Sequence, residues 1–548
     1  MAGLIGIGQS ALAAAYAQLQ TTGHNIANVN TPGYVRQEVI LETAGGMYTG
    51  AGFIGRGVNV ADVARRYDQF IAREVTNNTS LAAGDAARAQ GLTRLDDLLA
   101  NTDDGLGAAL DNLRSALGDL VNRPGDASTR EVVMRRADAL AEQFRSTSAQ
   151  LRQLGSETDL RLAETANQVN DRLEAIADLN HQIVATQGSG KQPSDLLDQR
   201  DKLIDEVSGS LQISRVAQSD GSVNLYSASG HALVLGRSAS KLVTQPDPLD
   251  TGKLQVSFQV GGTRITADAS SLGTGEIAGL VRFRDQDLAA AQARVGQLAA
   301  AVAGAYNAQQ AEGFDAEGTP GDPLFASPMT VKAVAAPGNS GSATLAVTVS
   351  KPEDLRATDY RLSFDGSAYQ LESLVDGSVT SLAGPAGTDH EVDGLQITIP
   401  GGMTIGDRFT IKGASGFAEQ MRLGFTDGSK LAAAGPSSTD PAMDNRNARL
   451  LAGLGDERLV DGGTATFTDA FAALVADVGS RTLQGKAASQ ASGALLSNAK
   501  ASFAAESGVN LDEEAARLLQ FQQAYQAASR VIATANSMFD TILSVISR

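Results

Sequence analysis

The first thirty residues carry a seven-residue repeat of apolar and small positions. One position of the repeat holds Ile5, Leu12, Leu19 and Ile26, and the position three residues further on holds Gly8, Ala15, Thr22 and Val29. This spacing predicts a helix whose seam packs against a second helix, as in a coiled coil. The helix should end near Asn28, because proline in the following Asn30-Thr31-Pro32-Gly33 disfavours helical backbone before it and glycine permits a turn.

The last forty residues show the same pattern over a longer span. The first seam position holds Leu511, Leu518, Tyr525, Ile532, Phe539 and Ile546, and the second holds Phe521, Ala528, Ala535 and Ile542. Asn510 precedes this segment and Glu513 follows three residues later, which is the spacing of a capping box. A second long helix with an apolar seam is therefore predicted at the C-terminus.

Charged side chains are nearly absent from both terminal segments. None occurs before Arg36, and beyond residue 514 the only ones are Arg517, Arg530, Asp540 and Arg548. The simplest interpretation is that the two helices pair within one subunit. That pairing does not explain the outer positions, which hold Ala, Gln, Ser, Thr and Asn where a solitary stalk would be charged. We expect the pair also to pack against copies of itself, since small uncharged residues approach closely without burying unpaired charge.

Between the ends, the pattern changes from helical to alternating and back. Residues 62–185 indicate helices with a charged, solvated face and a seam at Leu162, Val169, Ile176 and Ile183. Short strands are predicted at QISRV, SVNLYS and HALVL, followed by a hairpin over 254–267 that turns at Gly261-Gly262. Helix returns over about 275–310, residues 328–435 alternate as short strands, and helix resumes at Asp444.

This order predicts an α+β protein of several domains, with the inserted layers projecting from the paired ends. Residues 1–60 and 511–548 would form a terminal coiled-coil polymerisation domain. Residues 61–327 and 436–510 would form a mostly helical bundle, or mixed middle domain, with β hairpins around 211–270. Residues 328–435 would form an inserted antiparallel β domain on the outside.

Composition argues against most kinds of site. The 548 residues include no Cys and only four His, at positions 24, 181, 231 and 390, too widely spaced for a local metal motif. A formal net charge of −18 gives nucleic acids no general attraction. No apolar run reaches the ~18–20 residues of a membrane span. We therefore expect no catalytic, cofactor-binding or metal site, no cofactor, and neither a nucleic-acid nor a membrane partner.

Several local patterns have ordinary structural explanations. The glycines at positions 3, 6 and 8 and at 52, 55 and 57 depart from the dinucleotide fingerprint. The stretch GFDAEGTPGD lacks the spaced acids and closing Glu of a calcium loop, so a turn-rich connector is the better interpretation. Adjacent acids such as Asp96-Asp97 diverge by about 100° on a helix and do not converge on a substrate. His24 has no second ligand nearby, which favours a structural role.

The segment SALAAAYAQLQTTGHNIANVNTPGYVRQ resembles the N-terminal signature of bacterial flagellar rod, hook and hook-associated proteins. The signature residues here are Thr22, Gly23, His24, Asn25, Ile26, Ala27, Asn28, Asn30, Thr31, Pro32, Gly33 and Tyr34. Within that group, three further stretches resemble the first of the junction proteins between hook and filament. They are LLDQRDKLIDEVSG, GEIAGLVRFRDQDL with its continuation NAQQAEGFDAEG, and SGVNLDEEAARLLQFQQAYQAASRVIATANSMFDTIL.

The resemblance implies a structural, non-enzymatic subunit of the bacterial flagellum. Such proteins leave the cell unfolded through the flagellar type III export apparatus and form a ring-like segment at the hook tip, outside the cell. Their paired terminal helices form the inner tube and their β domains face outward. The implied partners are copies of the chain, the hook protein, the second junction protein, and an export chaperone on roughly residues 511–548.

Two other functions remain to be compared with this one. The chain resembles the wider axial group, so a hook subunit or a distal rod subunit is an alternative. A secreted enzyme with a site in the β region or the mixed region would belong to a different class. A filament subunit is disfavoured, because the TTGHNIANVNTPGY signature belongs to the rod and hook side of the group.

Overall fold

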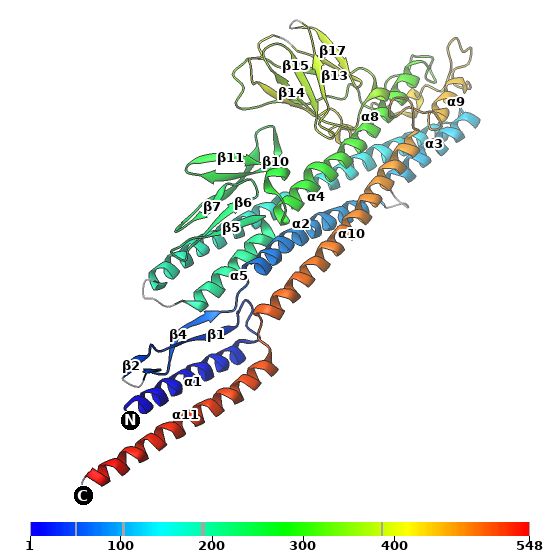
Figure 1. Cartoon of the computed structure of the whole chain (residues 1–548). Coiled ribbons are helices and arrows are strands. Elements are labelled where there is room, and N and C mark those ends of the chain that lie inside the picture. The colour runs from blue at the N-terminus through cyan, green and yellow to red at the C-terminus, as the bar shows by residue number, and fades with distance from the viewer. Residues whose placement is uncertain are drawn as a thin grey trace.

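The two ends of the chain lie side by side at one end of an elongated molecule (Figure 1). The computed structural model describes residues 2–49, 52–100, 105–187, 192–384, 387–399 and 401–546. The first helix, α1, spans Ala2–Asn28, and the last helix, α11, spans Leu511–Ile546. Helix α1 ends at Asn28 as the Pro32-Gly33 turn predicts, and Gly33 has the positive φ of +86° that glycine permits.

The segment that follows α1 is a β ribbon that the sequence pattern did not predict. Strand β1 (Gln37–Thr43) pairs antiparallel with β4 (Val58–Arg65), with an irregularity between Ile40 and Leu41. Strands β2 (Met47–Thr49) and β3 (Gly52–Ile54) form a second pair. The expectation of helix from residue 62 is thus wrong. Helix begins only at residue 69, because the Asp68 carboxylate caps it by accepting hydrogen bonds from the N–H groups of residues 70 and 71.

Long helices form the body of the molecule. They are α2 (Gln69–Leu99), α3 (Leu106–Asn122), α4 (Ala127–Gln187), α5 (Ser194–Ser210) and α10 (Phe467–Ser507). Helix α4 has 61 residues, and its predicted seam of Leu162, Val169, Ile176 and Ile183 is fully buried. Shorter helices α6 (Ala269–Leu272) and α7 (Glu276–Arg282) precede a π-helical turn, η1 (Phe283–Leu288), that leads into α8 (Ala289–Ala311).

Two small sheets follow α5 in the sequence. The first is a four-stranded antiparallel sheet, β5-β6-β7-β8, made of Ile213–Ala217, Val223–Ser227, Ala232–Leu235 and Ser238–Ala239. The second sheet has the strand order β11-β10-β9. Its strands are β9 (Lys241–Asp247), β10 (Asp250–Val260) and β11 (Thr263–Ala267). The predicted turn at Gly261-Gly262 joins β10 to β11, and both glycines have positive φ.

Strands β12 to β19 form a separate unit, here called the β module (residues 333–411). One sheet has the order β12-β19-β14-β15-β16 and the other has the order β13-β18-β17. The strands are Ala333–Ala335, Ala346–Val349, Tyr360–Phe364, Tyr369–Ser373, Val379–Leu382, Asp389–Val392, Leu395–Thr398 and Arg408–Ile411. The short 3-10 helix η2 (Pro352–Asp354) lies between β13 and β14. Leu362, Ile397 and Ile411 are fully buried.

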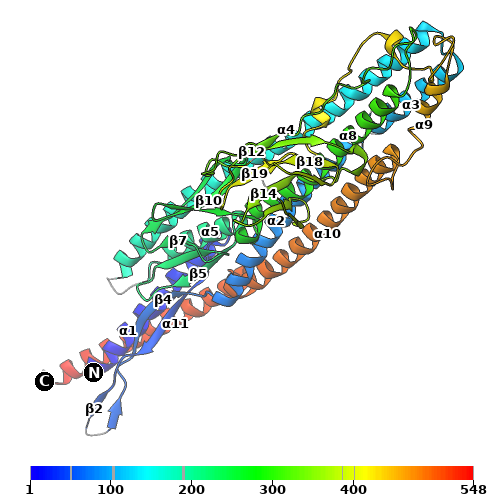
Figure 2. The ribbon, with the colours of Figure 1, turned by 90° about the horizontal axis from the view of Figure 1, so that it is seen from above.

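Residues 412–445 return from the β module to the helices. They contain two short 3-10 helices, η3 (Ala418–Gln420) and η4 (Gly428–Lys430), and are followed by α9 (Arg446–Gly453). Arg130 of α4 donates to the Leu431 carbonyl at 2.6 Å, so this segment packs on the helical body. Both β regions lie on one side of the long helices and α10 on the other (Figure 1), and Figure 2 shows them overlying the helices from above. The fold confirms the predicted α+β class.

Glycine allows very close helix packing at the crossing of α2 and α7. A Cβ atom added at Gly279 would lie 2.2 Å from the Gly84 carbonyl oxygen, and one added at Gly84 would lie 2.9 Å from the Gly275 carbonyl oxygen. The neighbouring atoms belong to backbone, which cannot rotate away as a side chain does. A larger residue therefore requires the two helices to separate.

We predict that Gly279→Ala lowers the free energy of unfolding by about 1–3 kcal/mol, because overpacking separates α2 from α7. The matched control is Gly118→Ala in helix α3, where an added Cβ meets nothing within 4 Å. The control should be neutral or stabilising by about 0.5–1 kcal/mol, because alanine favours helix. Denaturant unfolding of both variants is the measurement, and equal effects would contradict the prediction.

Candidate assembly interface

Small residues form the centre of the contact between α1 and α11. On α1, Gly8, Ala15 and Thr22 are buried, and on α11, Ala528 and Ala535 are buried. A Cβ atom at Gly8 would lie only 2.7 Å from Cγ1 of Ile532, so the helices approach closely at this point. All of these small residues come from the second position of each predicted heptad seam. Small side chains allow this short approach because they place little volume between the helix backbones.

The larger seam residues are only partly buried by this contact. Half-buried in the single chain are Ile5, Leu12, Leu19, Ile26, Leu518, Phe521, Tyr525 and Ile532. Leu511, Phe539 and Ile542 are exposed by 50%, 47% and 46%. The side chain of Ile546 lies outside the described residues. Ile532 packs directly against Gly8, yet it and the other large seam residues only partly leave water within one chain.

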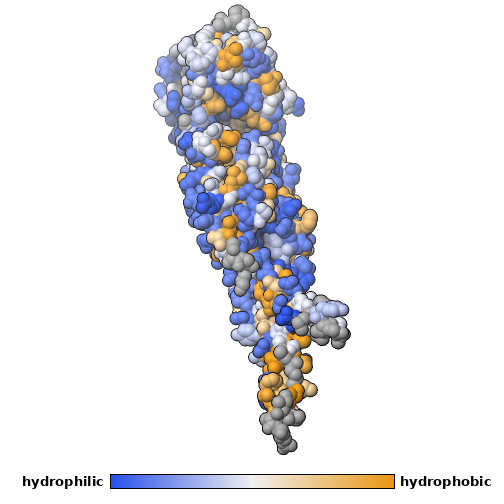
Figure 3. Space-filling view, turned by 60° about the vertical axis from the view of Figure 1, so that its left-hand side comes forward, coloured by the Kyte–Doolittle hydropathy of each residue, from blue (hydrophilic) through white to orange (hydrophobic). Residues whose placement is uncertain are grey.

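Further apolar side chains cover the outer faces of the pair. Exposed ones include Leu4, Tyr16, Leu519, Val531, Met538 and Leu543. Figure 3 shows hydrophobic residues gathered at the narrow end of the molecule, whereas the wider part is mainly hydrophilic. An exposed apolar surface of this kind is typical of a protein-protein contact. Taken alone, the terminal pair therefore leaves much of its apolar surface in water.

A buried polar cluster fixes the base of the pair, and we call it the terminal lock (Asn25, Tyr34, Arg36, Gln37 and Glu514). The Glu514 side chain is only 1% exposed, and its Oε1 accepts from Arg36 Nε at 2.7 Å. Its Oε2 accepts from Asn25 Nδ2 at 3.0 Å. Asn25 Oδ1 accepts in turn from the Tyr34 hydroxyl at 2.7 Å and from the Gln37 N–H at 3.0 Å. The lock thus joins α1, the turn after it, β1 and α11.

The neighbouring carboxylates favour the charged form of Arg36. Burial on its own would lower the pKa of Arg36, but the adjacent carboxylates of Glu514 and Glu513 raise it above its ordinary value. Arg36 Nη1 also lies 3.0 Å from the Glu513 carboxylate, whose side chain is 58% exposed.

Glu513 was expected to complete a capping box with Asn510. Asn510 does cap α11, accepting from the N–H groups of residues 512 and 513. The Glu513 carboxylate, however, pairs with Arg36.

The signature residues make the turn that builds the lock. Asn28 Nδ2 donates to the His24 carbonyl at 3.0 Å, and Thr31 Oγ1 donates to Asn28 Oδ1 at 3.1 Å. His24 Nδ1 lies 3.0 Å from the Tyr34 hydroxyl oxygen, and the two rings meet edge-on. Thr22 is buried and Ile26 half-buried, while Gly23, Ala27, Asn30, Pro32 and Gly33 are exposed or line the turn. The structural role expected for His24 agrees with these contacts.

The same turn is held against helix α5 of the body. The Val35 N–H donates to Asp198 Oδ2 at 3.2 Å, and Arg65 Nε lies 2.7 Å from the other oxygen of that carboxylate. A second Arg65 nitrogen lies 2.7 Å from Asp201. Burial raises the pKa of Asp198 to about 6, because loss of solvent outweighs the attraction of Arg65. These acids belong to the stretch LLDQRDKLIDEVSG, so two separate resembling motifs meet here.

The other candidate patterns make ordinary structural contacts in the described part of the chain. No group of three or more His, Cys, Asp or Glu that could hold a metal ion occurs within the described ranges. In the stretch GFDAEGTPGD, Asp315 Oδ1 accepts from two backbone N–H groups of the turn, and its Oδ2 lies 3.5 Å from Lys430. No helix in the described part of the chain is long and apolar enough to cross a membrane.

Models of two kinds of flagellar protein match different parts of the chain. The model "Flagellar hook-associated protein FlgK helical domain" matches residues 92–325, and "Flagellar hook-associated protein 1, D2-like domain" matches residues 334–413. The ends match models of rod proteins: "Flagella basal body rod protein" at residues 5–34 and "Flagellar basal body rod FlgEFG protein C-terminal" at residues 500–545.

Full-length relatives decide the family. The flagellar hook-associated protein 1 of Salmonella typhimurium is 34% identical over 555 residues, with 100% of both chains covered. The protein of the same name from Escherichia coli is 33% identical over 551 residues, again with 100% of both covered. The chain belongs to the flagellar hook-associated protein 1 family. The structure of the flagellar hook junction protein FlgK from Burkholderia pseudomallei shares the fold, with a TM-score of 0.73 at 24% identity, covering 78% of this chain and 98% of that one.

In this member of the hook-associated protein 1 family, the lock lies where the rod-like ends meet the family-specific body. Asn25 and Tyr34 lie within or at the edge of the residues that match the N-terminal rod model, and Glu514 lies within the C-terminal one. The sequence singled out Asn25 and Tyr34 only through the signature, and the roles of Arg36, Arg65 and Asp198 were missed. Glu514 was interpreted as one of two adjacent acids on a solvated face or at a helix end. It does lie in the first turn of α11, but the solvated face is wrong because its side chain is only 1% exposed. The available signal was the isolation of Arg36, the first charge after 35 uncharged residues. A lone charge beside an apolar segment calls for a partner.

We predict that Glu514→Ala lowers the free energy of opening of helix α11 by about 3–5 kcal/mol, because Arg36 keeps a buried charge without a full partner. Hydrogen exchange of the α11 amides is the measurement. The control is Glu513→Ala, which removes the exposed contact to the same Arg36 and should cost less than about 1 kcal/mol. Adding Arg36→Met to Glu514→Ala should recover part of the loss. Equal protection of α11 in the two single variants would refute the prediction.

Proposed function

We propose that this protein is a structural, non-enzymatic subunit of the junction between hook and filament, and that it assembles through its paired terminal helices. The observation that carries the proposal is full-length similarity to hook-associated protein 1 combined with a terminal pair whose outer face is apolar and nearly uncharged. In a polymer, copies of the pair cover one another's apolar faces. The exposed apolar face of the terminal helix pair thus supports a role in which copies of the chain pack together at the junction.

The proposed partners follow from the two kinds of similarity. The rod-like ends support packing against copies of this chain and against other axial proteins, among them the hook protein below and the second junction protein above. The apolar segment 511–548 is also the proposed binding region for an export chaperone before assembly. We propose export without a cleaved signal and a final position outside the cell, at the tip of the hook. Residues 1–60 with 511–548, 61–327 with 436–510, and 328–435 remain the proposed domain limits.

A hook or distal rod subunit is the less favoured function. Rod-protein models match only the two ends, whereas the models for residues 92–325 and 334–413 are specific to hook-associated proteins. The difference therefore lies in the body and the β module. Immunolabelling of isolated flagella separates the two functions, since a junction protein labels one point and a hook subunit labels the whole hook.

We predict that deleting the gene leaves cells with complete hooks but without filaments, and with filament subunits released into the medium. The physical reason is that filament subunits have no matching surface on the hook tip once the adaptor is missing. Electron microscopy of the cells and gel analysis of the medium provide the measurement. Loss of the hooks themselves would instead support the distal rod alternative.

We predict that a chain with Leu519→Asp fails to restore motility to the deletion strain. The isolated variant should keep its stability to within about 0.5 kcal/mol, because Leu519 is 60% exposed in the single chain. A carboxylate there would be buried without a partner once copies pack together. The matched control is Leu235→Asp, the same change at a residue that is 48% exposed on strand β7 of the body. It should restore motility. Motility with Leu519→Asp would contradict assembly through the outer face of α11.

A further inference from the structure

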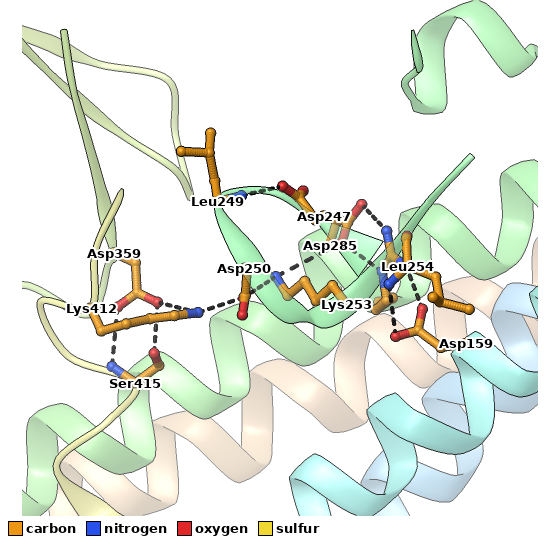
Figure 4. A network of polar contacts seen from close by, with 11 residues as sticks. Asp159, Asp247, Leu249, Asp250, Lys253, Leu254, Asp285, Asp359, Lys412 and Ser415 are labelled. Atoms are coloured by element: carbon orange, nitrogen blue, oxygen red, sulfur yellow. Dashed lines mark hydrogen bonds and ion pairs between the residues drawn. The ribbon is translucent and has the colours of Figure 1, made fainter. Parts of the chain in front are cut away.

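Many charged side chains of the body lie beside an opposite charge of the same chain. Figure 4 shows one such network, in which Lys412 Nζ lies 2.6 Å from Asp250 Oδ2 and 3.7 Å from Asp359 Oδ2. A network of this kind satisfies its own charges and leaves little to offer a partner. The region where α2, α5 and α10 meet differs, because several charged side chains there have no ion-pair partner among the described residues.

A pocket of about 410 Å³ lies between the start of α2, helix α5 and the end of α10. Its apolar wall includes Val35, Ala72 and Val75, which are buried, and the half-buried Phe503. The ring of Tyr67 meets the Phe503 ring edge-on, with 5.9 Å between the ring centres. The volume lies within the range of ligand pockets, so the pocket is large enough to take up an aromatic side chain.

Open charges of both signs lie on the wall of this pocket. Asp205 of α5 is exposed, and its Oδ1 accepts a hydrogen bond from the Thr76 hydroxyl at 3.1 Å. Lys500 of α10 and Lys202 of α5 are exposed as well. None of these three charges makes an ion pair within the described ranges. The other two acids on the wall already pair with arginines, and they are Asp201 and Glu206.

The opposite face of α2 presents side chains of matching character. Phe70, in the first turn of α2, is 79% exposed. Arg73 and Glu74 follow three and four residues later, so they lie beside it on the helix surface. The Arg73 guanidinium lies 5.6 Å from the centre of the Phe70 ring. Arg73 and Glu74 are exposed and make no ion pair in the described part of the chain. We call these three residues the knob (Phe70, Arg73 and Glu74).

The knob and the pocket face in opposite directions. Ala72, Val75 and Thr79 line the pocket. At about 100° per residue, these three fall within about 60° of one another around α2, and Phe70 lies about 180° from their centre. One chain therefore does not reach its own pocket with its own knob. Copies that place each knob in the next pocket repeat a head-to-tail contact, and such a contact builds a ring when the rotation closes.

We propose that the knob of one copy enters the pocket of the next copy in the assembled junction. The ring of Phe70 fills the apolar part of the pocket. Arg73 then pairs with Asp205. Glu74 pairs with Lys500 on the other side of the ring. An aromatic anchor in a pocket supplies most of the affinity of such a contact, and charges of both signs fix its orientation, because the reverse orientation brings like charges together. The inference rests on the proposed function, since it requires copies of the chain to be neighbours.

Cross-linking of isolated flagella tests this contact, and the absence of cysteine from the chain makes the placement of thiols unambiguous. Asn77→Cys introduces an exposed thiol beside the knob, two turns after Phe70, and Lys202→Cys introduces one on the pocket wall. A chain with both changes is expressed in the deletion strain, and its flagella are treated with a short bismaleimide. We expect a ladder of dimers and higher multiples on a denaturing gel, detected with an antibody to this chain. Each single-cysteine chain should give no ladder, because a head-to-tail contact joins unlike sites.

Charge reversal shows whether the proposed ion pair holds the contact. Adding Arg73→Glu or Asp205→Lys to the double-cysteine chain should reduce the ladder about tenfold, because each brings like charges together. Combining the two changes should restore it to within about twofold. The matched control is Asp178→Lys, the same change at an exposed aspartate of α4 that makes no ion pair in the described part of the chain. It should leave the ladder unaltered and should not restore the Arg73→Glu chain.

The outcomes separate this contact from the proposed function. If immunolabelling finds the double-cysteine chain at the junction but no ladder forms, the contact is rejected and the junction function stands. If the cysteine-free parent is absent from the junction, the proposed function fails and the contact fails with it. A cross-link to a protein of another size gives the pocket to a different axial protein and overturns the proposal.

Motility provides a second measurement that needs no cysteine. Where circular dichroism shows a folded double-cysteine chain that does not assemble, the charge variants of the parent decide. Loss of motility with Arg73→Glu and recovery when Asp205→Lys is added support the contact. Loss without recovery in a folded chain, or full motility with Arg73→Glu alone, rejects it.

Discussion

The buried ion pair between Arg36 and Glu514 joins segments 478 residues apart, and the arrangement of the two chain ends depends on it. A charge that is almost fully removed from water is tolerated only when a partner and further hydrogen bonds satisfy it. Here the carboxylate is shared between Arg36 and Asn25, and Asn25 holds the turn that leads into β1. The requirement to satisfy one buried carboxylate thus places α1, the ribbon and α11 relative to one another.

The helix pair above this lock is built for contact in two directions. Small residues at its centre bring the backbones together, and the large apolar side chains of the pair stay half-buried or exposed. A pair with large residues between the helices would bury its own apolar surface and have less to offer a neighbour. The near absence of charge on the outer faces removes the main cost of burying them in a polymer. Most charged side chains lie instead in the body and the β module, and the net charge of −18 of the whole chain favours a hydrated surface there.

Ionic contacts also relate the larger units to one another. The turn after α1 meets α5 through Val35, Arg65 and Asp198, and the β module meets the β9–β10 hairpin through Lys412 and Asp250. One continuous apolar core joins the helices to the β module, and a second joins α4, α5 and α7 to strands β5 to β11. Charged side chains add contacts between surfaces outside these cores. Such charged contacts are directional, since they need particular atoms at particular distances, and they fix relative positions more specifically than apolar contact does.

Local features of this fold could be read directly from the sequence. The end of α1 at Asn28, the turn at Gly261-Gly262 and the buried seam of α4 depend on spacing and backbone preference within a few residues, so the pattern determines them. The ribbon at residues 37–65 was missed, because its strands are short, mostly exposed and follow a strong helical signal. Which heptad position lies at the centre of the terminal contact was decided only by tertiary structure, since it depends on how closely two helices approach. The same holds for Arg36 with Glu514 and for Lys412 with Asp250. Nothing in either neighbourhood specifies a charge partner that is 478 or 162 residues away, and only the folded chain brings the partners within a few ångströms.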